Sequence, residues 1–211
     1  MSRSPVRCTS PAEGETDRFA AAPIPSSPEA VHSDREETRI RQIRDRAENL
    51  FRTRQYHCAE AILVAMNRGF RGGLSEPQAV ALASGLTHGL GGSGCTCGAV
   101  SGAILALGLL VGGDHPHRNR SRVRRASAAL HERFKAAHGS TCCRVLTRKG
   151  EKSGQARFDR CGAFTGDGAE MAARLALEFR PELARTADPD TAEKRDSRLV
   201  GFLLRVGRLV R

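Results

Sequence analysis

Four cysteines that lie far apart in the sequence each fall near an expected helix start or a tight turn. They are Cys58, Cys97, Cys143 and Cys161. A thiol at a helix N-terminus lies close to the positive end of the helix dipole and to unpaired backbone N–H groups, and both favour the thiolate. The thiolate is the form that attacks disulfides and binds metals. The placement therefore indicates thiol or metal chemistry and is compatible with either.

The spacing of these thiols is a poor match to the common zinc modules, which carry paired Cys-x-x-Cys knuckles. Cys95 and Cys97 are separated by one residue only, and Cys142 and Cys143 are adjacent. We expect instead a site that several helices of one bundle assemble. In such a site the thiols either bind an iron–sulfur centre or another metal, or cycle between dithiol and disulfide.

The remaining cysteines, Cys8, Cys95 and Cys142, carry weaker cases, although either Cys95 or Cys97 can supply the second thiol of the set. Cysteine also fills protein cores as a small hydrophobe. Four thiols near helix starts within about 100 residues nevertheless favour chemistry over packing. Positive charge from His57, His138 or Arg144 would lower the thiol pKa further wherever the fold brings it close.

Other candidate sites are weaker. Four more histidines are possible ligands: His88, His115, His117 and His131. We interpret the pair at 115 and 117 as part of a solvated turn. The glycine run of residues 89–94 lacks the Lys-Ser/Thr ending of a phosphate loop, and no Ser-His-Asp order or nucleophile elbow is visible.

Apolar periodicity predicts helices along the chain and no strand. Aromatic residues are scarce, with eight Phe, one Tyr and no Trp, and a core of Ala, Leu, Val and Gly suits closely packed helices. We expect an all-α fold, a compact bundle of about six helices. The expected helices span residues 34–54, 58–68, 75–86, 97–111, 118–137 and 167–180, and residues 195–211 form an amphipathic segment.

Local signals place the ends of these helices. Ser33 or Asp34 can cap the first helix, and Ser75-Glu76-Pro77-Gln78 reads as a capping box. The glycines of residues 89–94 require a flexible loop or positive φ. Gly98, Gly102 and Ala106 form a smooth stripe on which another helix can pack closely. We further expect Ser140 to cap a turn that holds Cys142 and Cys143, and residues 167–170 to begin the sixth helix.

Composition divides the chain into three parts: a disordered tail over residues 1–33, a helical domain with the cysteines over residues 34–182, and a linker with a basic amphipathic helix over residues 183–211. The net charge of +11 is uneven. Residues 1–113 hold 12 Lys/Arg against 11 Asp/Glu, whereas residues 114–211 hold 22 against 12. A basic half attracts anionic partners, but no nucleic-acid recognition motif accompanies it.

We expect the protein in the cytoplasm. The first 33 residues contain no apolar run typical of a secretory signal, and the longest apolar stretch, residues 99–111, is too short to span a bilayer. Thiols in that compartment are reduced by default, so a metal or redox role is favoured over a static disulfide framework.

The order of the motifs resembles the C_GCAxxG_C_C family, a group of small proteins classed as redox-active. The resemblance covers residues 46 to about 180, roughly 135 of the 211 residues. The matching residues are Tyr56-His57-Cys58-Ala59-Glu60-Ala61, Gly94-Cys95, Cys97-Gly98-Ala99-Val100-Ser101-Gly102, Leu105-Ala106-Leu107-Gly108, Gly139-Ser140, Cys143-Arg144, Leu146 and Cys161.

The resemblance implies a redox or metal-linked role, with the family's four characteristic cysteines falling on Cys58, Cys97, Cys143 and Cys161. This chain departs from the family pattern in its extra thiols at 95 and 142 and in its basic C-terminal extension. The resemblance carries little information about a substrate.

Two hypotheses of different classes follow. In the first, the clustered thiolates bind a metal or iron–sulfur centre or undergo dithiol/disulfide cycling, with an electron-transfer partner. In the second, the chain is a non-catalytic helical interaction module whose cysteines are structural and whose basic C-terminal half contacts a transporter or another membrane partner. The sequence is compatible with an enzyme and with a binding protein, and with more than one oligomeric state.

Overall fold

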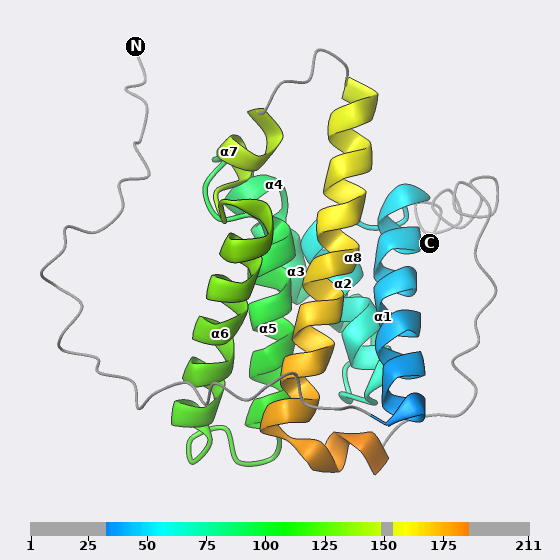
Figure 1. Ribbon diagram of the computed structural model, residues 1–211, viewed down its shortest axis with the longest axis vertical. Helices are drawn as coiled ribbons and strands as arrows, with labels where there is room; N and C mark the ends of the chain where they lie inside the picture. The colour runs from blue at the N-terminus through cyan, green and yellow to red at the C-terminus, as the bar shows by residue number, and fades with distance from the viewer. Residues whose placement is uncertain (1–32, 149–153, 186–211) are drawn as a thin grey trace, which may run out of the picture.

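Helices form where the sequence predicts them over most of the chain. The computed structural model describes residues 33–148 and 154–185. Within these ranges the fold is all-α and contains no strand, only an isolated bridge between Thr96 and Cys142 (Figure 1). The elements are α1 (Asp34–Arg52), α2 (Cys58–Gly69), α3 (Glu76–Ala83), the 3-10 turn η2 (Ser84–Leu86), α4 (Thr87–Leu90), α5 (Gly98–Gly112), α6 (Arg120–His138), α7 (Cys143–Arg148), α8 (Gly154–Phe179) and the 3-10 turn η3 (Pro181–Arg185).

Two predicted capping signals are confirmed. The Ser33 hydroxyl accepts a hydrogen bond from the backbone N–H of Glu36, whose carboxylate accepts one from the backbone N–H of Ser33. Ser75 and Gln78 make the same reciprocal pair at the start of α3. These bonds satisfy backbone donors that the first turn leaves without a helical partner.

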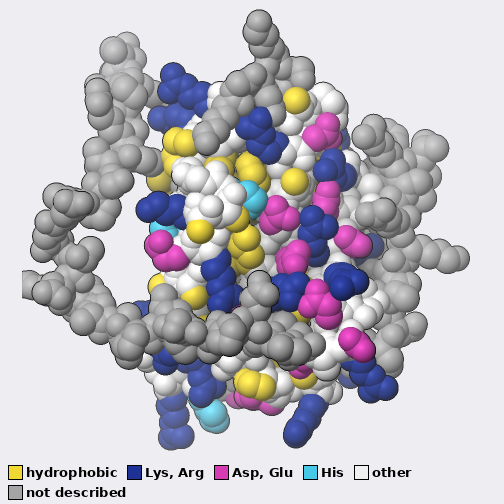
Figure 2. All heavy atoms as spheres, in the orientation of Figure 1, with side chains coloured by type: hydrophobic (Ala, Val, Ile, Leu, Met, Phe, Trp, Pro, Cys, Tyr) yellow, Lys and Arg dark blue, Asp and Glu magenta, His cyan; other side chains and the backbone are white. Residues whose placement is uncertain are grey.

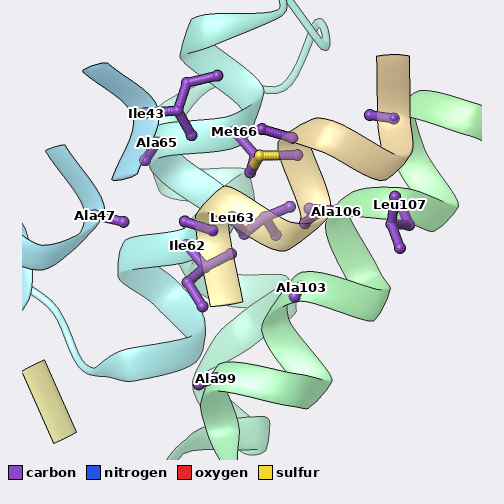
Figure 3. Close-up of a cluster of buried hydrophobic side chains, with 14 of the residues drawn as sticks. Ile43, Ala47, Ile62, Leu63, Ala65, Met66, Ala99, Ala103, Ala106 and Leu107 are labelled. Atoms are coloured by element: carbon purple, nitrogen blue, oxygen red, sulfur yellow. The ribbon is translucent and has the colours of Figure 1, made fainter. Parts of the chain in front are cut away.

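The core lies between α8 and the helices that surround it, α1, α2, α5 and α6. Figure 3 shows side chains from α1, α2 and α5 converging there, among them Ile43, Ile62, Met66 and Leu107. Burial of such side chains stabilises the fold by about 1.5–3 kcal/mol for each large aliphatic group, as an upper estimate. The core fixes the relative positions of the helices and so of the residues at their ends.

The predicted small-residue stripe lets α5 approach α2 closely. A Cβ atom added to Gly102 would lie 2.6 Å from the Cα of Ala59 and 2.8 Å from its carbonyl oxygen. Both distances are far below contact between carbon or oxygen atoms, so only glycine permits this packing. The stripe faces the core, whereas Gly108, two residues after Ala106 on the same helix, faces open space.

The expected start of the sixth helix at residues 167–170 is wrong. One continuous helix, α8, runs over Gly154–Phe179, so Asp167 lies in its interior. The capping signal at residues 167–170 is not used, and the glycines of α8 are contact points: a Cβ on Gly162 would lie 3.2 Å from Cζ of Arg52, and one on Gly168 would lie 3.0 Å from the Ala99 carbonyl oxygen. Close packing against α1 and α5 therefore outweighs the low helix propensity of glycine.

The predicted need for positive φ in the loop before α5 is confirmed. Gly89, Gly91, Gly92 and Gly94 all have positive φ, and two neighbours that are not glycine, His88 and Leu90, share this conformation. α5 itself begins one residue later than expected, with Cys97 as its N-cap. The loop crosses the upper end of the bundle in the view of Figure 1, close to α4 and α7.

Several predictions concern residues outside the described ranges: the tail over residues 1–32 with Cys8, and the basic segment over residues 186–211. The three-part division of the chain stays a prediction. Residues Pro181–Arg185 are part of the described bundle, where they form η3 with Leu183 buried in the core. Within the described ranges, no helix is both long and apolar enough to cross a membrane.

Candidate thiol site

All four predicted thiols line a single cavity at one end of the bundle. Its volume is about 470 Å³. Its described lining consists of Phe51, His57, Cys58, His88, Gly94, Cys97, Ala99, Cys143, Arg144, Thr147, Gly154, Arg157, Phe158, Cys161 and Phe164. Residues from α1, α2, α5, α7 and α8 thus meet around one space, although Cys58 and Cys161 are more than 100 positions apart in the sequence.

Three of the thiols lie at helix starts, as expected. Cys58 is the first residue of α2, Cys97 is the N-cap of α5, and Cys143 is the first residue of α7. Cys161 differs, because it lies about two turns inside α8 and not near a helix start. Its expected position is wrong because the long helix α8 begins at Gly154, well before the predicted start.

A short antiparallel bridge joins the segments that carry Cys97 and Cys143. The backbone N–H of Cys97 donates to the Thr141 carbonyl at 2.8 Å, and that of Cys143 donates to the Cys95 carbonyl at 2.6 Å. A further bond runs from the N–H of Arg144 to the Gly94 carbonyl at 2.9 Å. These bonds hold α7 against the N-terminus of α5 and so hold the two thiols beside each other.

Two glycines make room for the sulfur-bearing side chains. A Cβ on Gly98 would collide with the Sγ atom of Cys58. One on Gly89 would lie 2.7 Å from the Cβ of Cys143, and the φ of +73° at Gly89 disfavours any side chain there. Gly98 at the start of α5 and Gly89 in the preceding loop are thus both needed for the observed arrangement of the thiols.

The Cys97 and Cys143 thiols form a hydrogen-bonded pair with opposite pKa shifts. The Cys97 thiol donates to Cys143, and this bond lowers the pKa of Cys143 to about 7 against the opposing effect of burial. The same bond, together with burial, raises the pKa of Cys97. At neutral pH a large fraction of Cys143 is therefore thiolate, whereas Cys97 keeps its proton.

The other two thiols are protonated at neutral pH. Burial raises the pKa of Cys58, although the backbone N–H groups of His88 and Ala59 oppose it by hydrogen bonding to the sulfur. Burial raises the pKa of Cys161 to about 11. The expectation that every helix-start position favours the thiolate is wrong here, because desolvation of the charged form outweighs the helix dipole at buried positions.

The positively charged neighbours are only partly those expected. His57 and Arg144 line the cavity, and Arg144 also donates to the Ser93 carbonyl at 2.7 Å. His138 instead packs between Phe134 and Phe164, with ring centroids 4.4 and 4.8 Å away. Burial lowers the pKa of His138, so it is neutral at pH 7 and does not supply the expected charge.

Sequence reasoning missed several lining residues. Arg157, Phe158 and Phe164 were not singled out, because the segment before residue 167 was not recognised as helical, and Phe51 was placed only on the apolar face of the first predicted helix. Continuing the helical pattern back from residue 167 would have placed Arg157, Phe158, Cys161 and Phe164 close together, at i, i+1, i+4 and i+7. His88, considered only as one ligand among several, lies in the cavity with its ring 4.6 Å from that of His57.

The other candidates lie outside the cavity lining. Cys142 donates its thiol to the Gly94 carbonyl at 3.4 Å, and Cys95 belongs to the bridge segment. Of the two alternatives for the second thiol, Cys97 is the one that lines the cavity. Of the remaining histidines, His131 contacts Glu132 and Thr141, His117 contacts Arg120, and the carbonyl of His115 closes a turn.

The fit of a metal centre can be judged from the arrangement of possible ligands. Over the residues that the structure describes, no group of three or more His, Cys, Asp or Glu side chains is placed to hold a metal ion. The thiols as they stand do not converge on one point in the way that a metal or iron–sulfur centre requires. The geometry instead brings two of them together as a pair.

Residues 56–175 match the model of a protein family described as "Putative redox-active protein (C_GCAxxG_C_C)". This match spans more than half of the chain, and the chain belongs to the C_GCAxxG_C_C family. The searches of curated proteins and of solved structures found no match.

Proposed function

We propose that this protein performs thiol–disulfide exchange, with Cys143 as the attacking thiolate and Cys97 as the second thiol. The observation that carries the proposal is the hydrogen-bonded pair of these two residues in a cavity, with the pKa of Cys143 lowered to about 7. A thiol with a pKa near ambient pH combines a large thiolate fraction with good nucleophilicity. Membership of a family named for redox activity supports the same chemistry.

The reaction balances with two thiols and one substrate disulfide. The Cys143 thiolate attacks one sulfur of the substrate, the substrate S–S bond breaks, and the first substrate thiolate leaves and takes a proton from solvent. A mixed disulfide then links Cys143 to the other half of the substrate. Cys97 loses its proton to water and attacks the Cys143 sulfur, which releases the second half. Two electrons pass from the two cysteines to the substrate, and a Cys97–Cys143 disulfide remains.

The hydrogen bond between the two thiols sets the order of these steps. Donation to Cys143 is the largest cause of the raised pKa of Cys97, so Cys97 holds its proton while Cys143 is a thiolate. Once Cys143 is in the mixed disulfide, it no longer carries the charge that held this proton. The raised pKa of Cys97 is then partly relieved, and Cys97 becomes the better nucleophile at the moment when its attack is needed.

The test uses the reduced full-length protein and the neutral substrate 2-hydroxyethyl disulfide, with products followed by mass spectrometry. We expect Cys143→Ser to slow exchange by at least about a hundredfold, because the remaining cavity thiols are protonated. We expect Cys97→Ser to accumulate the mixed disulfide on Cys143, because the second attack is lost. Cys142→Ser, one residue away and outside the cavity, is the matched control and keeps the parent rate.

The proposal is overturned if Cys143→Ser, shown by circular dichroism to keep its helical content, reacts at the parent rate. Closure of a protein disulfide at the parent rate in Cys97→Ser would reject Cys97 as the second thiol. The interaction-module hypothesis, with a transporter or membrane partner, stays a prediction, and so does the cytoplasmic location. Deleting residues 190–211 and measuring liposome or partner binding tests it.

A further inference from the structure

We infer that the disulfide substrate is a small organic molecule with negative charge, bound inside the cavity with its S–S bond against Cys143. This inference rests on the proposed function and adds the class of substrate. Three properties of the cavity support it: its size, its charge and its apolar walls.

The size of the cavity and the burial of its thiols favour a small molecule. The cavity volume of about 470 Å³ falls within the range typical of small-molecule sites. Cys97 is only 7% exposed, and Cys143 is half-buried. The second attack at the Cys143 sulfur therefore takes place within the cavity. A compact disulfide enters such a space more readily than one fixed on the surface of a folded protein.

The charge of the cavity favours an anion. Two arginines, Arg144 and Arg157, contribute to its lining. Both residues are exposed to solvent, so they lie at the mouth of the cavity. The charge of Arg157 acts on the thiols, since it is one of the groups that lower the pKa of Cys161. The described lining includes neither Asp nor Glu. An approaching anion thus meets positive charge without a compensating carboxylate in that lining.

The apolar walls favour an organic skeleton over an inorganic anion. The rings of Phe51 and Phe158 stack with centroids 5.0 Å apart, and Phe164 lines the same space. The Arg54 guanidinium lies over the Phe158 ring at 4.9 Å, so the carbon chain of a ligand would contact the remaining apolar surface of these rings. Arginines at the mouth together with aromatic walls suit a molecule with carboxylate ends and a carbon body around its disulfide.

The experiment compares three disulfides that share one skeleton and differ only in their end groups: 3,3′-dithiodipropionate, 2-hydroxyethyl disulfide and cystamine, which are anionic, neutral and cationic. Each single-turnover rate with the reduced full-length protein is divided by the rate of the same disulfide with 2-mercaptoethanol, a neutral thiol, at the same pH and salt concentration. We expect this relative rate to fall in the order anionic, neutral, cationic. The dianion should exceed the dication by at least about tenfold, as for charge-steered association.

Arg157→Gln identifies the source of the preference. We expect it to reduce the anion-to-cation ratio of relative rates by at least about threefold. The control is Arg122→Gln, an exposed arginine of α6 outside the described cavity lining, which removes the same charge from the chain. We expect the ratio to be unchanged in this variant.

The outcomes separate the two proposals. Equal relative rates for all three disulfides, or an unchanged ratio in Arg157→Gln, overturn the inference of an anionic substrate and leave the exchange activity standing. Faster reduction of the interchain disulfides of insulin than of all three small disulfides overturns the inference of a small substrate. No reaction with any disulfide removes the proposed function and this inference with it.

Discussion

The two halves of α8 present arginine in contrasting surroundings. Toward its C-terminal end, Arg174 donates to both carboxylate oxygens of Glu37 at 2.8 Å and to Glu170 at 2.8 Å. Figure 2 shows acidic and basic side chains interleaved over this seam between α1 and α8. Toward its N-terminal end, Arg157 stands at the thiol cavity, whose described lining contains no carboxylate.

The arginines of the seam form ion pairs that hold α1 and α8 together, whereas those of the cavity contribute charge to the candidate site. At the seam, Arg44 also pairs with Asp167 at 3.2 Å and with Glu170 at 3.1 Å, so positive and negative groups alternate. The Glu37 carboxylate has a pKa below its usual value because Arg174 hydrogen-bonds to it. At the cavity, Arg144 and Arg157 share the lining with thiols and aromatic rings, and the charge of Arg157 helps to lower the pKa of Cys161.

The largest expected effect tests whether the thiols that line the cavity differ in reactivity because their pKa values differ. The pKa of Cys143 is lowered to about 7 and that of Cys161 is raised to about 11. At pH 7 about half of Cys143 is thiolate, against about one part in ten thousand of Cys161, and the greater nucleophilicity of the more basic thiolate offsets part of this. We expect iodoacetamide to modify Cys143 roughly a hundredfold faster, as measured by peptide mass spectrometry.

The pH profile of the same reaction gives the sign of the shift. Modification of Cys143 should rise as pH increases, because deprotonation creates the nucleophile, and reach half of its plateau near pH 7. A profile that is half-maximal near the ordinary value of about 8.5 would contradict the role of the Cys97 hydrogen bond. In Cys97→Ala, which lacks that donor, we expect the midpoint to shift upward.

A smaller effect tests the close packing of α5 against α2, which helps to fix the position of the cavity end of the bundle. Gly102→Ala puts a methyl group 2.6 Å from the Cα of Ala59, and we expect it to lower the free energy of unfolding by about 1–3 kcal/mol in urea denaturation. Gly108→Ala on the same helix is the matched control. Its added Cβ meets open space, so we expect a gain of up to about 1 kcal/mol from helix propensity. Equal effects of the two variants would show that α5 and α2 do not pack this closely.

The smallest effect tests the comparison of the two arginines directly. Arg174→Gln removes the partner of Glu37 and Glu170, and we expect the Tm to fall by about 2–4 °C in differential scanning calorimetry. Arg157→Gln should change the Tm by less than about 1 °C, because most exposed arginines contribute little to stability. A larger loss in Arg157→Gln than in Arg174→Gln would reverse the assignment of the two regions.

Much of the fold could be predicted from the sequence because its signals are local. Capping boxes at Ser33 and Ser75, apolar periodicity and the glycine-rich loop each act within a few residues, and each is confirmed in the structure. The start of α8 could not be placed in this way. Residues 167–170 resemble a capping signal when they are considered locally, and only the helices packed against Gly162 and Gly168 explain why the helix continues through them.

In the candidate site too, local signals identified some features, whereas others depend on contacts between distant segments. The choice of four cysteines followed from helix starts and the resemblance to a family, and all four line one cavity. Their protonation states could not be predicted, because burial and the bond between Cys97 and Cys143 depend on contacts between distant segments. Arg157, Phe158 and Phe164 were missed because the first half of their helix was not recognised.

The bridge between Thr96 and Cys142 has a consequence for heat resistance. It holds Cys97 beside a partner about 46 positions further along the chain, so a covalent link between the two sulfurs would close a long loop. In the chain-entropy model, such a cross-link lowers the entropy of the unfolded state and so raises its free energy by about 4 kcal/mol at 25 °C. The protein with a Cys97–Cys143 disulfide would then melt at a higher temperature than the protein with two thiols. Its melting temperature would therefore report the redox state of this pair.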